Sequence, residues 1–153
     1  MNRLSNQEEK SKLPANYLEL KKAANRMSNW RVRLDAVAEL GQCKHKQTID
    51  VLTHRMINDP VYKVQEAAYK SLKKFGEDVQ MPEQNKFDLL KDASKVFLRI
   101  KKSLPRDHTF EEYREKLKNM RLDLYDTYEG DKGADFDKWL ENKWQTMETK
   151  KGK

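Results

Sequence analysis

Apolar residues recur every three or four positions along most of the chain, which is the spacing of helices with one buried face. The stretches "VRLDAVAELG" (32–41) and "VQEAAYKSLK" (64–73) place valine, alanine and leucine at matching positions, at an offset of 32 residues. Between them, Ile49, Leu52 and Met56 follow the spacing i, i+3, i+7 and predict another amphipathic helix. The pattern therefore predicts a repeating unit of helix, turn and helix.

Turn signals precede both matching stretches. Residues 28–29 (Ser-Asn) stand before the first, and residues 58–60 (Asn-Asp-Pro) stand before the second. Asn and Asp cap helices, and Pro is favoured in the first helical turn. Inside the second stretch, Ala67, Ala68 and Ser71 are small enough to let paired helices approach closely. These residues predict a stacking surface between helices.

With these residues the sequence resembles the HEAT-like repeats of phycobilisome-lyase-type proteins, whose pattern runs Asp-Pro, Val-Arg, Ala-Ala and Ala-Leu-Gly. The second copy fits with Asp59, Pro60, Val64, Ala67, Ala68, Leu72, Phe75 and Gly76, and the first fits with Val32, Arg33, Ala36, Leu40 and Gly41. Gln65 departs from the usual Arg, and "EDVQMPEQN" (77–85) lengthens the turn before the next helix. The resemblance implies a fold more strongly than a function.

The expected architecture is all-α, a short α-solenoid of two HEAT-like helix pairs within a single domain, 1–153. An N-terminal helix is expected in 15–27, the HEAT-like repeats in 28–104, a C-terminal helical extension in 105–148 and a tail in 149–153. In this assignment the helix at 28–41 pairs with the helix around Ile49–Met56. The helix after Pro60 pairs with a helix at 85–104.

Composition agrees with a helical protein. Of the 153 residues, 37% are hydrophobic and 37% are charged, with only five Gly and four Pro, which favours helices over a sandwich or barrel. No apolar run reaches the roughly 18 residues of a membrane span, and the polar start carries no apolar segment typical of a secretory signal. The one cysteine, Cys43, fits a half-buried thiol in a reducing compartment. A cytoplasmic protein with no membrane partner is expected.

Charge is distributed unevenly. The first 76 residues hold 15 Lys or Arg and 8 Asp or Glu, and this excess equals the whole net charge of +7. On the helix expected at 85–104, apolar residues share one side, and the opposite side collects Lys91, Lys95, Arg99 and Lys102. The preceding helix adds Lys70, Lys73 and Lys74. By resemblance, the second helix of each pair lines a concave face, which would turn this stripe towards a partner.

Two interpretations of the basic stripe remain open. Four cations at this spacing fit a solvent-exposed face of a helix. They also fit a track for the phosphates of nucleic acid or for an acidic protein.

The C-terminal extension carries its own signals. Thr109 and Glu112 form a capping box that opens a helix. A narrow apolar seam then follows, made of Phe110, Tyr113, Leu117, Met120 and Leu124. The last helix, 136–147, presents the aromatic anchor candidates Phe136, Trp139 and Trp144. These aromatic residues either cap the open end of the repeat stack or bind a partner.

The chain offers little chemistry for an enzyme. Its three histidines lack the spacing of a zinc site, and it has neither a Gly-x-Ser-x-Gly motif nor a phosphate-binding glycine loop. No catalytic residue, metal or cofactor is assigned. The expected function is a non-enzymatic adaptor that recognises a protein partner, with nucleic-acid binding through the basic face as the alternative.

The third possible function, after these two, is that of an enzyme. Alkylpurine-type DNA glycosylases are also built from HEAT-like repeats, and the resemblance to them covers fold and charge only. The oligomeric state is left open.

Overall fold

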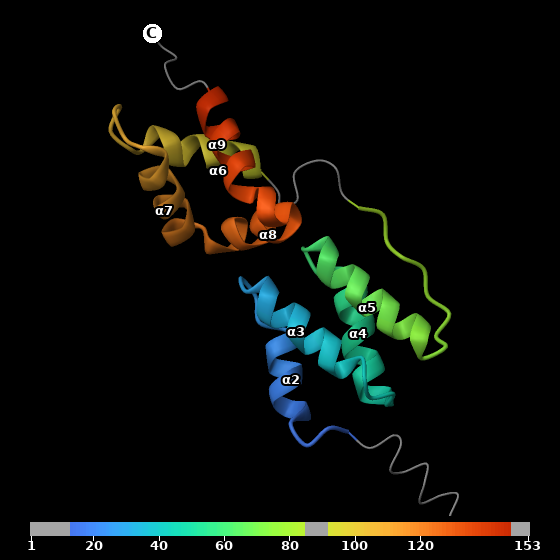
Figure 1. Cartoon of the computed structure of the whole chain (residues 1–153). Coiled ribbons are helices and arrows are strands. Elements are labelled where there is room, and N and C mark those ends of the chain that lie inside the picture. The colour runs from blue at the N-terminus through green and yellow to red at the C-terminus, as the bar shows by residue number, and fades with distance from the viewer. Residues whose placement is uncertain (1–12, 85–91, 148–153) are drawn as a thin grey trace, which may run out of the picture. The chain divides into compact units, whose positions relative to one another are not determined.

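The computed structural model describes residues 13–84 and 92–147. Every regular element within these ranges is a helix (Figure 1). Two compact units are present, Met1–Gln84 and Asn85–Lys153, called unit 1 and unit 2 below. The division falls within the segment in which the sequence predicts the repeats.

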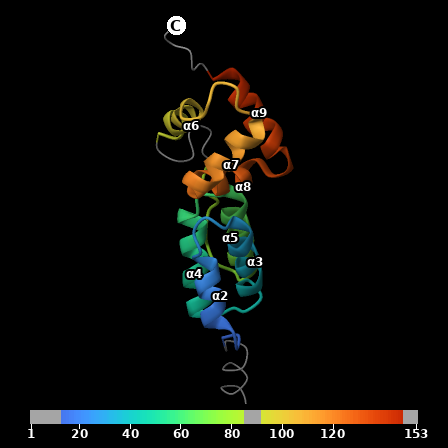
Figure 2. The same cartoon turned by 90° about the vertical axis from the view of Figure 1, so that its left-hand side faces the viewer.

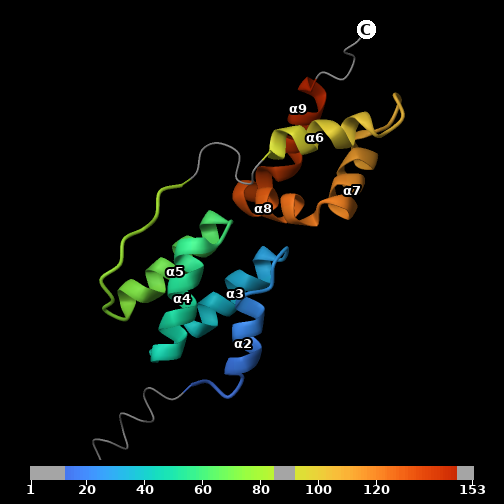
Figure 3. The same ribbon diagram turned by 180° about the vertical axis from the view of Figure 1, so that it is seen from behind.

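The described residues of unit 1, 13–84, form two helical hairpins. Helix α2 packs on α3 and α4 packs on α5, as the reverse view in Figure 3 also shows. The hairpins contact each other mainly through α3 and α5, and more sparsely through α2 and α4. The helices are α2 (Tyr17–Ala24), α3 (Trp30–Leu40), α4 (Lys46–Asn58) and α5 (Tyr62–Lys74).

Local hydrogen bonds explain where these helices begin. The Asn29 side chain accepts a hydrogen bond from the Val32 amide at 3.2 Å, so the predicted cap of α3 is confirmed. At the start of α4, the His45 side chain accepts from the Gln47 amide at 3.0 Å. The Thr48 hydroxyl oxygen accepts from the His45 amide at 3.1 Å. Together they form a capping box that the sequence did not reveal.

The repeat offset is confirmed by the core of unit 1. Helices α3 and α5 begin 32 residues apart, at Trp30 and Tyr62. Two of the three matched pairs are buried in both copies, Ala36 with Ala68 and Leu40 with Leu72, while Val64 is buried and Val32 is half-buried. A Cβ atom added to Gly41 at the end of α3 would lie 2.8 Å from the Cβ of Ser71 on α5. The small side chains therefore permit a close contact between the hairpins, as predicted.

The predicted pairing of the helices is wrong by one helix. The observed hairpins are α2 with α3 and α4 with α5, whereas the sequence suggested that α5 pairs with a helix at 85–104. A turn of three residues after Asn58 folds α5 back on α4. After α5 the chain turns at Gly76, whose positive φ of 90° ends the helix, and runs without regular structure to Gln84. The next helix packs in unit 2.

The described residues of unit 2, 92–147, form four α-helices and a short 3-10 turn, and Figure 2 shows the helices from a second side. Contacts link α6 to α7, α7 to α8 and α9, and α8 to α9. The elements are α6 (Ala93–Lys102), α7 (Phe110–Met120), α8 (Leu122–Lys132), η1 (Gly133–Asp135) and α9 (Phe136–Thr146). The predicted capping box at Thr109 and Glu112 is confirmed, with hydrogen bonds of 3.1 and 2.8 Å.

The apolar seam predicted for the extension is interrupted. The backbone leaves the helical conformation at Arg121, with φ −138° and ψ 68°, so α7 and α8 are separate helices. Phe110, Tyr113 and Leu117 are buried from α7 and Leu124 is buried from α8, while Met120 at the break is 60% exposed. One continuous helix would have kept Met120 on the buried side.

Candidate functional site

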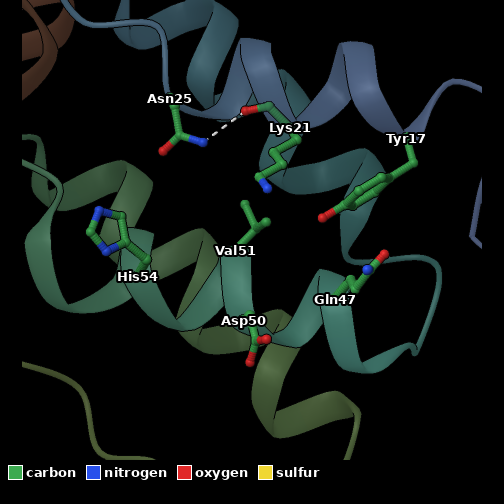
Figure 4. Close-up of a pocket in the computed structure, with 7 residues that line it drawn as sticks. All are labelled: Tyr17, Lys21, Asn25, Gln47, Asp50, Val51 and His54. Atoms are coloured by element: carbon green, nitrogen blue, oxygen red, sulfur yellow. Dashed lines mark hydrogen bonds between the residues drawn. The ribbon is translucent and has the colours of Figure 1, made fainter.

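A groove lies between α2 and α4 in unit 1 (Figure 4). Its volume is about 390 Å³, and it is open to solvent. The lining residues are Tyr17, Lys21, Asn25, Gln47, Asp50, Val51 and His54. All of them belong to α2 and α4 or to the residue that follows α2. The groove is therefore a feature of the sparse contact between the two hairpins.

Residue spacing explains how the groove forms. On α2, Tyr17, Lys21 and Asn25 are four residues apart and share one face. The facing side of α4 carries polar side chains three or four positions apart, among them Gln47 and His54. Tyr17 and Gln47 mark one end of the groove, and Asn25 and His54 mark the other (Figure 4). Large polar side chains separate α2 from α4, whereas Gly41 and Ser71 let α3 and α5 meet.

The groove offers both signs of charge and both kinds of hydrogen-bonding group. Lys21 and Asp50 are exposed on opposite walls, and Tyr17 is buried. The Asn25 side-chain amide donates to the Lys21 carbonyl at 2.8 Å, which fixes its orientation. Nδ1 of His54 lies 3.2 Å from the Asn58 amide nitrogen. The same amide nitrogen donates to the His54 carbonyl at 3.3 Å, and His54 itself lines the groove.

Large apolar side chains are exposed on or after the two helices that form the groove. Leu18 on α2 is 77% exposed, and Ile57 on α4 is 58% exposed. Met27, three residues after α2, is 58% exposed. In the described part of unit 1, the large exposed apolar side chains all lie on or directly after α2 and α4. Such side chains are common in surfaces that another protein covers.

A buried ion network fixes the hairpins that form the groove. The Asp59 carboxylate accepts from Arg33 Nε at 2.8 Å and from Arg33 Nη2 at 3.2 Å. It also accepts from Arg55 Nη1 at 2.9 Å and from the Val61 amide at 2.9 Å. Arg33 belongs to the first hairpin, while Asp59 and Arg55 belong to the second, so the network joins the two.

The same network explains the unusual Gln65. Arg33 and Gln65 occupy matching positions of the two copies, and each donates to a backbone carbonyl near the end of the preceding helix. Arg33 donates to Arg26 at 2.9 Å, and Gln65 donates to Met56 at 2.9 Å. Gln65 thus keeps the local hydrogen bond, and Arg33 adds the ion pair. Arg33 and Asp59 both belong to the repeat pattern of the sequence. Their ion pair, which spans 26 positions, was not predicted.

The predicted basic residues lie on two units. Lys70, Lys73 and Lys74 are exposed on α5 of unit 1. Lys95, Arg99 and Lys102 are exposed on α6 of unit 2, and Lys91 lies outside the described residues. Sequence reasoning missed Lys63, which shares one side of α5 with Lys70 and Lys74 at a spacing of i, i+7, i+11.

The predicted aromatic anchors pack within unit 2. Phe136 is buried, and Trp139 and Trp144 are half-buried against the same core. The Trp139 ring stacks on Tyr128 with 5.2 Å between centroids. The indole nitrogen of Trp144 donates to His108 Nε2 at 2.8 Å. Packing inside unit 2 accounts for the burial of these three residues.

The described residues offer neither a metal-binding cluster nor a membrane span. Within residues 13–84 and 92–147, no group of three or more His, Cys, Asp or Glu could hold a metal ion. None of the helices in these ranges is both long enough and apolar enough to cross a membrane.

A family model described as HEAT repeats matches residues 18–95, about half of the chain. The chain belongs to the HEAT repeat family. The match begins in α2, ten residues before the repeats were expected, and this agrees with the hairpins α2–α3 and α4–α5. It concerns HEAT repeats in general, so the phycobilisome-lyase-type subclass stays a prediction. Searches of curated proteins and of solved structures gave no match.

Proposed function

We propose that this HEAT repeat protein is a non-enzymatic binding module and that it recognises a protein partner through the α2–α4 groove. One observation carries the proposal: a groove with donors, acceptors and both charges lies between α2 and α4, the two helices that also expose Leu18 and Ile57. Interfaces between proteins combine apolar contacts with a hydrogen-bonding rim in this way. No catalytic residue is proposed.

The chemistry of the groove favours protein over nucleic acid as its ligand. A phosphate backbone needs uniform positive potential, and the Asp50 carboxylate in the groove would repel it. A peptide segment can place an acidic side chain at Lys21 and a basic one at Asp50. Its backbone can bond to the amides of Asn25 and Gln47, because a side-chain amide both donates and accepts.

The size of the groove restricts the ligand further. A volume of about 390 Å³ is at the lower end of ligand pockets, roughly 300 to 1,000 Å³. This holds a few side chains of a short segment, and Leu18 and Ile57 extend the contact beyond the groove. The proposed ligand is therefore a short segment of a partner protein that carries both charges and at least one apolar side chain.

Charge-reversed variants test the proposal in a capture experiment. The groove variant combines Lys21→Glu with Asp50→Lys, and the control combines Glu66→Lys with Lys70→Glu on α5. Both keep the net charge of the chain and change exposed residues. The partner is captured from a lysate with and without nuclease, identified, and titrated as a pure protein. We expect nuclease-resistant capture and binding weakened about tenfold or more by the groove variant alone.

Two outcomes would contradict this. Unchanged binding by the groove variant would exclude the groove as the contact surface. Capture that depends on intact nucleic acid, and that is lost with the α5 variant, would instead support the second candidate function.

That second candidate is nucleic-acid binding through α5, favoured by the exposed Lys63, Lys70 and Lys74 on one side of the helix. Each lysine that pairs with a phosphate should, when neutralised, lower the slope of log affinity against log salt by about 0.9 for duplex DNA. A slope unchanged by Lys63→Gln, Lys70→Gln and Lys74→Gln would exclude this face.

A further inference from the structure

A second pocket lies in unit 2, at the connection between α6 and α7. Its volume is about 400 Å³, and its lining is strongly basic. The lining residues are Lys101, Lys102, Leu104, Pro105, Arg106 and His108. No acidic residue is among the described residues that line it. Neither the groove nor the basic face of α5 includes this pocket.

Hydrogen bonds to α9 hold one wall of the pocket in place. His108 Nδ1 lies 2.6 Å from the Pro105 carbonyl, so this nitrogen carries the proton. His108 Nε2 then accepts from the Trp144 indole. Lys101 donates to the carbonyls of Trp144 and Met147, and its ammonium lies 5.5 Å from the centre of the Trp144 ring. The pocket is thus preorganised by packing against the last helix.

Other lining residues of the pocket carry positive charge that is exposed to solvent. Lys102 and Arg106 are exposed, and within residues 92–147 no carboxylate forms an ion pair with either. Lys102 ends α6, where a cation is stabilised by the helix dipole. Arg106 lies beyond Pro105, outside the helix, so the dipole does not explain its place. The two cations converge on one pocket from different elements.

We propose that this pocket binds a phosphoryl group with two negative charges, such as pyrophosphate or the terminal phosphate of a nucleotide. Lys102 and Arg106 donate charge-assisted hydrogen bonds to the phosphoryl oxygens, and Arg can donate two in parallel. Leu104 and Pro105 form an apolar wall against which an organic group can lie. A volume of about 400 Å³ accommodates a small ligand of this kind.

Calorimetric titration of the full chain with pyrophosphate and with ATP tests the proposal. The pocket variant is Lys102→Gln with Arg106→Gln, and the matched control is Lys70→Gln with Lys74→Gln, which removes the same charge from unit 1. We expect saturable one-to-one binding by the wild type and the control. The affinity of the pocket variant should be lower by about tenfold or more. Equal affinity for both ligands assigns the site to the phosphoryl group alone, and tighter ATP binding adds the organic group.

An NMR measurement locates the site independently. The indole N–H signal of Trp144 should shift on addition of pyrophosphate, because its acceptor His108 lines the pocket. The indole signal of Trp30, in unit 1, serves as the internal control and should stay in place.

Three results would overturn the proposal. The first is the absence of saturable binding by the wild type. The second is an equal loss in both double variants, which would mean attraction by bulk charge. The third is tighter binding of a short oligonucleotide than of pyrophosphate, if the same pocket variant abolishes that binding. This result would point to a phosphodiester backbone as the ligand.

Discussion

The two units are stabilised by different kinds of side chain. Unit 1 packs mostly aliphatic and small residues, and its hairpins approach so closely at Gly41 and Ser71 that no extra atom fits. Unit 2 packs aromatic rings, with Phe97 and Tyr128 edge to face at 5.3 Å between centroids. Small residues let two helices pack closely in one register. Aromatic rings instead fill the wider spaces between irregularly arranged helices. The two helical hairpins, α2–α3 and α4–α5, thus lie in the unit with the smaller side chains.

Buried polar groups differ between the units as well. Unit 1 buries the ion network of Arg33, Arg55 and Asp59, and Arg55 Nε has no hydrogen-bond partner among the described residues. Unit 2 buries the Tyr113 hydroxyl, which donates to the Phe97 carbonyl at 3.0 Å. Losing one ion should thus harm unit 1 more than losing one hydroxyl harms unit 2. Indole signals report on each unit separately: Trp30 on unit 1, and Trp139 and Trp144 on unit 2.

The largest effect is expected from Ala68→Glu. Ala68 is fully buried in unit 1, so the change forces a carboxylate into an apolar environment without a partner. We expect a loss of about 4 kcal/mol or more in the free energy of unfolding, measured by urea denaturation through the Trp30 signal. The exposed Lys70→Glu should cost less than about 0.5 kcal/mol. Equal effects of the two changes would mean that the repeat core is assigned wrongly.

Asp59→Asn should come next. It leaves Arg33 and Arg55 buried without their carboxylate, which costs about 3 kcal/mol in comparable buried pairs. The exposed Asp50→Asn is the matched control. Unit 1, monitored by the Trp30 signal, should unfold at a lower urea concentration. The unfolding of unit 2, monitored by the Trp139 and Trp144 signals, should change less. If the unfolding of unit 1, monitored by the Trp30 signal, is unchanged, the network does not stabilise the hairpins.

Gly41→Ala tests the close approach in unit 1. The new methyl group would meet Ser71, so we expect a loss of about 2 kcal/mol from overpacking. The second change Ser71→Gly removes the obstructing side chain and should recover part of this loss in a double-mutant cycle. Additive effects of the two changes would place the strain elsewhere.

The smallest effect is expected from Tyr113→Phe in unit 2. Loss of its hydrogen bond should cost about 1 kcal/mol at neutral pH. Burial raises the pKa of Tyr113, so the folded state keeps the hydroxyl neutral while the unfolded state ionises from about pH 10. Ionisation of the unfolded state lowers stability as pH rises above this value. The difference between wild type and variant should therefore shrink between pH 8 and 10.5, and a constant difference would contradict this explanation.

Much of unit 1 could be predicted from sequence, because its information is local. The 32-residue offset and the cap at Asn29 depend on residues near one another in the chain, as does the cap at Thr109 in unit 2. The pairing of helices was predicted wrongly because an apolar stripe marks a buried face without naming the helix that covers it. The break at Arg121 was missed because neither Gly nor Pro marks it.

The groove was also beyond prediction from sequence. It arises where Tyr17, Lys21 and Gln47 fail to pack closely, and polar residues of this kind look like any solvated helix face. The basic pocket itself was not predicted, although one of its lining residues, Lys102, belonged to the predicted stripe. Its other cation, Arg106, follows a proline in a loop, where helical periodicity gives no information.

Site-specific photo-crosslinking tests the α2–α4 groove most directly. A photoreactive amino acid replaces Gln47 or His54 in the groove, or Glu66 or Lys70 on α5 as the matched exposed control, in the full chain. A protein-binding groove predicts one adduct of the same mass at positions 47 and 54, resistant to nuclease, and little adduct at positions 66 and 70. An adduct formed at positions 66 and 70 and missing at 47 and 54 would contradict the groove as the site of partner recognition.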